Sequence, residues 1–217
     1  MEKNGGLSQA ETYYWKGYAS DRLKKSRMAE FYWKTALEAS ENSTAKEDLD
    51  IYAKTASRLA NLLSVKGNYE GTLKMGEPAA IRLEEQQCDT TSDYVNLLIY
   101  IGCCQAATNK DNKDAEYDFE RAYQKHKENI DKNHTDAAYK NAIAGLINIA
   151  YFCNHSQNYQ AALKWIGHFG ELLNEYVQRP DTDPAYIDKQ LARFDIYQAL
   201  ALEGLGKKEE AAKVSES

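Results

Sequence analysis

Residues 150–162 read AYFCNHSQNYQAA, and this stretch decides the fold. It opens with a small residue, Ala150, in one apolar helix-like segment and closes with a second small residue, Ala162, in the next. The polar run Gln157-Asn158-Tyr159 between them predicts a short turn. Small residues placed in this way let two antiparallel helices approach backbone to backbone, so the stretch predicts a helical hairpin.

The same pattern recurs four more times, with the second small residue 12 or 13 positions after the first. The pairs are Gly17 with Ala29, Ala60 with Thr72, Gly102 with Ala115, and Ala199 with Ala211. Five hairpins in series predict an all-α, right-handed superhelical solenoid, a fold that usually holds another molecule. We expect one repeat domain over residues 1–217, with repeats at about 8–40, 45–87, 92–130, 135–178 and 183–217.

Composition narrows the classes of partner. The 217 residues are 43% hydrophobic and 28% charged, as in folded proteins, and the formal net charge is −6. Because no run of Lys and Arg could neutralise phosphates, we expect no nucleic-acid partner. The apolar stretch Tyr94 to Cys104 is about half the ~20 residues that a membrane helix needs, so we expect no membrane insertion within this sequence. No signal peptide is visible in Met1 to Ala10.

Motifs for chemistry are missing from the sequence. There is no His-Glu-x-x-His, Cys-x-x-Cys, G-x-S-x-G, P-loop or dinucleotide fingerprint, so we expect neither an enzyme nor a bound cofactor. Cys88, Cys103, Cys104 and Cys153 are too few for a disulfide scaffold and are interpreted as free, mostly buried thiols. A metal site using Cys153 and His155 is the alternative, but these residues point to different sides of a helix.

The hairpins resemble a known repeat. In one of them Gly102 is followed by Ala115, Phe119 and Ala122, with the later residues at spacings of four and three on one helical face. Together with turns such as Gly67-Asn68-Tyr69, this pattern resembles the tetratricopeptide repeat over nearly the whole chain. The period differs: equivalent small residues are 43, 42, 48 and 49 positions apart, against about 34 in the family. Repeats this long resemble those of bacterial sensor and regulatory proteins and of some motor-cargo adaptors.

The resemblance also implies where a ligand lies. In such solenoids the first helix of each pair, the A helix, lines the concave groove. The groove positions that it implies here are Tyr14, Tyr18, Lys54, Ser57, Asn61, Asn96, Ile99, Cys103, Ile147, Tyr151, Asn154, Arg193 and Ile196. Tyrosine faces and asparagine amides suit an extended peptide. The alternative for each residue is packing against neighbouring helices or exposure to water. Tyr14 and Tyr18 stand where chaperone-tail binders of this family carry Lys and Asn, so that subtype is not expected.

These observations lead to three hypotheses about function. The first is a protein- or peptide-binding region of a bacterial signal-transduction protein, and more narrowly the periplasmic sensor region of a membrane-bound histidine kinase. It rests on the long repeats, the 16 tyrosines and a last helix that stops at Ser217, as in a fragment of a longer chain. The second is a cytosolic scaffold or adaptor, and the third is an enzyme with a site between repeats. A homodimer is compatible with all three.

Overall fold

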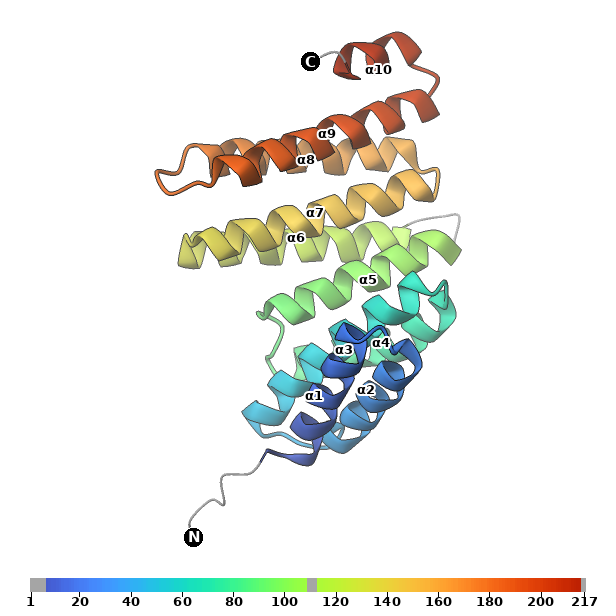
Figure 1. The fold of residues 1–217 in the computed structure, drawn as a ribbon, viewed down its shortest axis with the longest axis vertical. Coiled ribbons are helices and arrows are strands. Elements are labelled where there is room, and N and C mark those ends of the chain that lie inside the picture. Colours follow the sequence, from blue (N-terminus) through green and yellow to red (C-terminus); the bar gives the residue numbers. More distant parts are fainter. Residues whose placement is uncertain (1–6, 109–112, 216–217) are drawn as a thin grey trace. The chain divides into compact units, whose positions relative to one another are not determined.

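The described part of the chain folds into helices alone. The structure is a computed structural model that describes residues 7–108 and 113–215. Within these ranges it contains ten α-helices and no strand (Figure 1), which confirms the all-α prediction. None of these helices is both long enough and apolar enough to cross a membrane. Two compact units are present, Met1–Thr108 and Asn109–Ser217, and their grouping into one domain over residues 1–217 stays a prediction.

The first unit contains five helices that pack on their neighbours along the chain. They are α1 (Gln9–Arg22), α2 (Ser26–Ser40), α3 (Lys46–Val65), α4 (Tyr69–Glu85) and α5 (Ser92–Thr108). Helix α1 packs on α2, and α3 packs on α4, as the small-residue pairs predict. Helix α3 also contacts α1 and α5, so the A helices α1, α3 and α5 lie in sequence beside one another.

The second unit repeats this arrangement. It contains α6 (Lys113–Asn133), α7 (Asp136–His155), α8 (Tyr159–Val177), α9 (Pro184–Gly204) and α10 (Lys208–Ser215). Helix α7 pairs with α8 and α9 with α10, while the A helices α7 and α9 also contact each other. The expected pairing of Gly102 with Ala115 joins helices of different units and stays a prediction, and residues 109–112 between them lie outside the described ranges.

A close contact between the α1 backbone and a tryptophan side chain of α2 fixes the first hairpin. Gly17 of α1 lies against the indole ring of Trp33 on α2, and Trp33 is only 1% exposed. A Cβ atom at position 17 would lie 2.5 Å from Trp33 Nε1 and 2.9 Å from Trp33 Cγ, which is closer than carbon and nitrogen atoms approach. The small residue is therefore a packing requirement, because any side chain there would displace the indole ring.

The turns inside four hairpins share one geometry. The second residue after the end of each A helix has positive φ: Lys24 (58°), Gly67 (74°), Gln157 (61°) and Gly206 (78°). The next residue donates its backbone N–H to a carbonyl near the end of the helix, as when Asn158 N donates to Cys153 O at 2.8 Å. This is the Schellman pattern, which satisfies carbonyls that the helix leaves unpaired. Two of the four positions, Gly67 and Gly206, are glycine, which adopts positive φ without strain.

The first residues of several helices are fixed by side chains that cap the helix N-terminus. Thr135 Oγ1 accepts from Ala138 N at 3.2 Å, and Asp183 Oδ1 accepts from Ala185 N at 3.0 Å, as expected from their places before α7 and α9. Before α5, Thr91 Oγ1 accepts from Tyr94 N at 3.2 Å. These side chains pair N–H groups that the first turn cannot satisfy, so each boundary is fixed by local chemistry.

Candidate functional site

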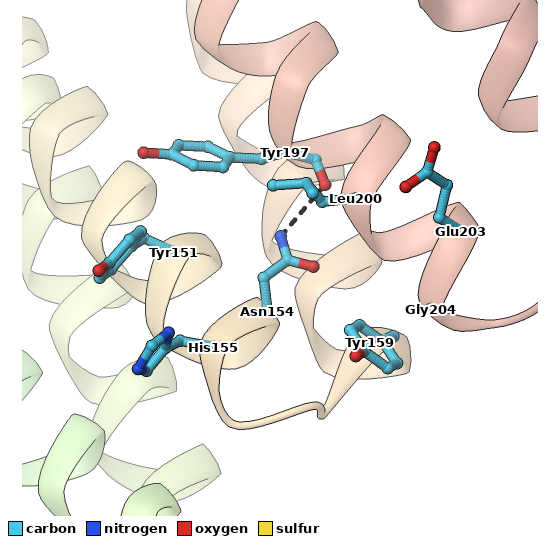
Figure 2. Close-up of a pocket in the computed structure, with 8 residues that line it drawn as sticks. All are labelled: Tyr151, Asn154, His155, Tyr159, Tyr197, Leu200, Glu203 and Gly204. Carbon is cyan, nitrogen blue, oxygen red and sulfur yellow. Dashed lines mark hydrogen bonds between the residues drawn. The ribbon is translucent and has the colours of Figure 1, made fainter.

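A pocket of about 490 Å³ opens in the second unit between α7, α9 and the start of α8 (Figure 2). Its volume falls within the range of about 300–1,000 Å³ that is typical of small-ligand sites. Eight residues line it: Tyr151, Asn154, His155, Tyr159, Tyr197, Leu200, Glu203 and Gly204.

Helical spacing brings the lining residues together. Tyr151, Asn154 and His155 are three and four residues apart at the end of α7, so they share one face of that helix. The face of α9 that meets them carries residues at the same spacing, beginning with Tyr197 and Leu200. The A helices of two successive repeats therefore form the two long walls of the pocket.

Asn154 connects the two walls. Its Nδ2 donates to the main-chain carbonyl oxygen of Tyr197 at 3.1 Å, which Figure 2 shows as a dashed line. Its Oδ1 atom is buried and has no hydrogen-bond partner. The hydrogen bond to Tyr197 gives the asparagine a structural role, because it links two A helices that contact each other.

Aromatic rings form most of the remaining lining. The rings of Tyr151 and Tyr197 meet edge to face, with centroids 6.3 Å apart and planes at 64°. On the other side of Tyr151, the imidazole of His155 lies parallel to it, with centroids 5.9 Å apart and planes at 10°. Tyr151 is 47% exposed, so much of its ring is available to a ligand.

Gly204 sets the position of the fourth ring. A Cβ atom at this last residue of α9 would overlap three atoms of the Tyr159 ring, so only glycine allows that ring to rest against the helix end. Tyr159 itself is the first residue of α8, placed by the capping side chain of Asn158, whose Oδ1 accepts from Ala161 N. Local turn chemistry and one glycine thus close the end of the pocket.

The predicted groove positions of the second unit divide into two groups. Tyr151 and Asn154 line the pocket. Ile147 is only 6% exposed and packs in the interior, while Arg193 is half-buried and donates to Gln190 Oε1 at 3.3 Å. Ile196 is 56% exposed but lies outside the pocket lining. Contact of any of these residues with a ligand stays a prediction.

In the first unit, the predicted positions on α1 lie beside cations of α3. Tyr14 is buried in the core beside Trp33, and burial raises its pKa, an effect that the Arg58 guanidinium opposes. The same guanidinium lies 5.5 Å from the ring centroid of Tyr18, which is half-buried. This pairing uses the ring face that a ligand would otherwise meet.

The remaining predicted positions of this unit differ in exposure. On α3, Lys54 is exposed, Asn61 is half-buried and Ser57 is 5% exposed. On α5, Asn96 is half-buried, whereas Ile99 and Cys103 are buried at 1% and 0% exposure. Helix α5 packs against both α3 and α4, which leaves little of its surface for a ligand.

A charged group near these residues was not anticipated from the sequence. Asp93 lies in the first turn of α5, where burial raises the pKa of its carboxyl while Lys54 and Arg58 act to lower it. The A helices of this unit thus carry two cations opposite one desolvated carboxyl group. Because Lys54 and Arg58 are exposed, their attraction to this carboxyl contributes little to stability.

The buried thiols have the properties of structural cysteines. Cys103, Cys104 and Cys153 are buried and Cys88 is half-buried. Burial raises the pKa of Cys104 to about 11 and that of Cys153 to about 12, which keeps both protonated at neutral pH. Among the described residues, no group of three or more His, Cys, Asp or Glu side chains is arranged to hold a metal ion.

Six lining residues were not among the predicted groove positions: His155, Tyr159, Tyr197, Leu200, Glu203 and Gly204. His155 follows Tyr151 by four residues, so the helical period alone could have added it. Tyr197 is one position beyond Ile196, which was predicted, and an error of that size rotates the side chain by about 100° around the helix. Tyr159 is the first residue of α8, and the groove positions were taken from A helices alone, so it was not included.

Solved structures with the same fold are helical repeat proteins. The crystal structure of BtubC (BKLC) from P. vanneervenii has a TM-score of 0.65 and 14% identity, covering 92% of this chain and 74% of that chain. A candidate kinesin light chain from Podosopora anserina with nearly identical TPR-like repeats has a TM-score of 0.67 and 11% identity, covering 98% of this chain and 94% of its own. The apo form of RapI has a TM-score of 0.59 and 15% identity, covering 99% and 87%.

No protein-family model and no curated protein matches the sequence. At identities of 11–15% the structural likeness shows the fold alone. It agrees with the small-residue pairs and the turns described above. The chain is therefore an all-helical repeat protein with the tetratricopeptide-like solenoid fold that its sequence pattern predicts.

Proposed function

We propose that this chain is a non-catalytic helical repeat domain that binds a segment of another protein at the pocket between α7 and α9. One observation carries the proposal: two successive A helices form a pocket of about 490 Å³ that includes Tyr151 and Asn154. Both were expected at a ligand groove from the repeat pattern. The similarity to other tetratricopeptide-like structures supports the same class of function.

The lining suits a polypeptide ligand. Exposed tyrosine rings bury a large area at small cost in side-chain entropy. The Glu203 carboxylate in the same lining can accept hydrogen bonds from the main chain or a side chain of a peptide. Anchoring by a few central aromatic residues is the usual way in which an interface gains most of its affinity.

The test is selection of binders from a random peptide library by the intact chain, followed by calorimetric titration of the selected peptides. Tyr151→Ala is expected to weaken binding about tenfold, because exposed aromatic anchors dominate such interfaces. Tyr117→Ala is the matched control, since Tyr117 is a 65% exposed tyrosine of α6 outside the pocket. Equal losses in the two variants, or no saturable binder, would refute the proposal.

A narrower form of the proposal concerns the cellular setting. The long repeats and the 16 tyrosines favour the periplasmic sensor region of a bacterial histidine kinase. A cytosolic scaffold that gathers two proteins agrees equally with the similar structures. Reading the native coding sequence on both sides of this chain separates the two: a signal peptide before it with a membrane helix and kinase domain after it supports the sensor, and their absence supports the scaffold.

A further inference from the structure

The pocket between α7 and α9 has a distinctive charge character. Four of its eight lining residues are aromatic, namely His155 and three tyrosines; one, Glu203, carries a carboxylate, and none is Lys or Arg. The faces of tyrosine rings carry partial negative charge and attract cations. The three tyrosine rings and the Glu203 carboxylate therefore make the pocket complementary to a positive group.

Hydrogen bonding in the pocket favours a donor. Asn154 Nδ2 already donates to the carbonyl oxygen of Tyr197, and Asn154 Oδ1 is buried, so the exposed anionic hydrogen-bonding group of the lining is the carboxylate of Glu203. The Glu203 carboxylate accepts hydrogen bonds and donates none. A ligand that brings several N–H donors would match this exposed carboxylate, whereas an anionic ligand would be repelled by it.

The same chain shows how it holds guanidinium groups elsewhere. The Arg82 guanidinium carbon lies 4.8 Å from the ring centroid of Tyr52, and that of Arg179 lies 5.1 Å from the ring centroid of Tyr139. Both arginines also donate to main-chain carbonyl oxygens at 2.6–3.0 Å. A tyrosine face next to hydrogen-bond acceptors is thus a recurrent arginine site in this fold, and the pocket presents both components at its surface.

We infer that the pocket binds the arginine side chain of a polypeptide partner. The planar guanidinium lies against the tyrosine rings and donates to the Glu203 carboxylate, and its methylene chain packs on Leu200. This inference rests on the proposed function and specifies its ligand. Arginine fits better than lysine, because a planar group with five donors can both stack on a ring and reach two acceptors.

The probe is N-acetyl-L-arginine methylamide, compared with its citrulline counterpart, which has nearly the same shape and no charge. Each is titrated into the ¹⁵N-labelled intact chain, and shifts of the α7 and α9 amide signals are recorded. We expect the arginine probe to bind about tenfold more tightly than the citrulline probe, from combined ring and carboxylate attraction. Glu203→Gln is expected to remove most of this preference.

Matched variants distinguish binding at the pocket from a general attraction between the negatively charged protein and a cation. Glu209→Gln removes the same charge from an exposed position of α10 outside the pocket and is expected to keep the preference for arginine. Tyr197→Leu is expected to weaken the arginine probe, with helical content by circular dichroism confirming that the variant is folded. Equal affinity for the two probes, or equal losses in Glu203→Gln and Glu209→Gln, would overturn the inference.

The outcome also separates this inference from the proposed function. Library peptides that depend on Tyr151 but show no enrichment of arginine, together with equal affinity for both probes, would refute the arginine ligand and leave peptide binding in place. Failure of the library and of both probes would refute both. Enrichment of arginine together with Glu203-dependent binding of the probe supports both.

Discussion

Replacing Gly17 by alanine tests the packing argument for the first hairpin. The new Cβ atom would lie 2.5 Å from Trp33 Nε1 and 2.9 Å from Trp33 Cγ. Trp33 is 1% exposed and is held on all sides by the core of α1, α2 and α3, so the ring has no free space into which to move. The helices themselves must separate to accept one methyl group.

Two effects of opposite sign set the magnitude. Overpacking of a well-filled core costs about 1–3 kcal/mol, and the contacts near the root of the indole favour the upper half of that range. Alanine in a helix interior recovers about 0.5–1 kcal/mol relative to glycine. The net expectation is that Gly17→Ala lowers the free energy of unfolding by about 1–2 kcal/mol.

Gly167→Ala is the matched control, because it is the same substitution inside α8 at an exposed position with no atom within 4 Å of the new Cβ. Only the helix-propensity effect applies there, so it should raise the free energy of unfolding by about 0.5–1 kcal/mol. Urea titration followed by circular dichroism measures both. If Gly17→Ala is as stable as Gly167→Ala, the close approach of α1 to Trp33 is wrong.

Three further predictions concern buried and contact groups. Burial lowers the pKa of His126 to about 4 from 6.5, so between these pH values the unfolded chain binds a proton that the folded chain does not. The free energy of unfolding should therefore fall by up to about 3 kcal/mol as the pH drops through this window. Urea titration at pH 7 and pH 4 measures the fall, which should be smaller in His126→Leu. Cys88 is half-buried and the other three cysteines are buried, so a thiol reagent at pH 8 should modify Cys88 first, and several fast thiols in the folded chain would contradict the burial. Gly204→Ala should displace the Tyr159 ring, which is half-buried and can rotate outward. The affinity for the selected peptides should therefore fall clearly, while the melting temperature changes little. A large loss of melting temperature with unchanged affinity would count against a role for that ring in the pocket.

The hairpins could be predicted because their signals are local. A glycine at position 67 and an asparagine after it determine a left-handed residue and a helix cap within a few residues of one another. Small residues such as Gly17 report a contact between helices that are adjacent in the chain. Each of these signals depends on spacing along one hairpin, and that spacing can be read directly from the sequence.

The pocket was predicted only in part because it joins different repeats. Tyr151 and Asn154 follow from the face of a single A helix, but the residues opposite them depend on how α9 is rotated and shifted against α7. The residues between α8 and α9 set that rotation, and no short pattern encodes it. Ile99 shows the converse error, because a position that projects toward a groove in an isolated repeat is buried once α3 and α4 both pack on α5.

The left-handed turn residues have a consequence for how this protein can change over evolutionary time. Of the six such positions within residues 7–108 and 113–215, two are glycine, and Lys24, Gln87, His134 and Gln157 hold the same conformation with a full side chain. A glycine at each would lower the strain and add about 0.5–1 kcal/mol of stability after its entropic cost. Lys24, Gln87 and His134 lie outside the pocket lining. Glycine substitutions at these turns can therefore add folding stability, which offsets destabilising substitutions among the residues that contact the ligand. Specificity can then diverge while the scaffold persists, and a protein engineer retargeting the pocket has the same three sites available for compensation.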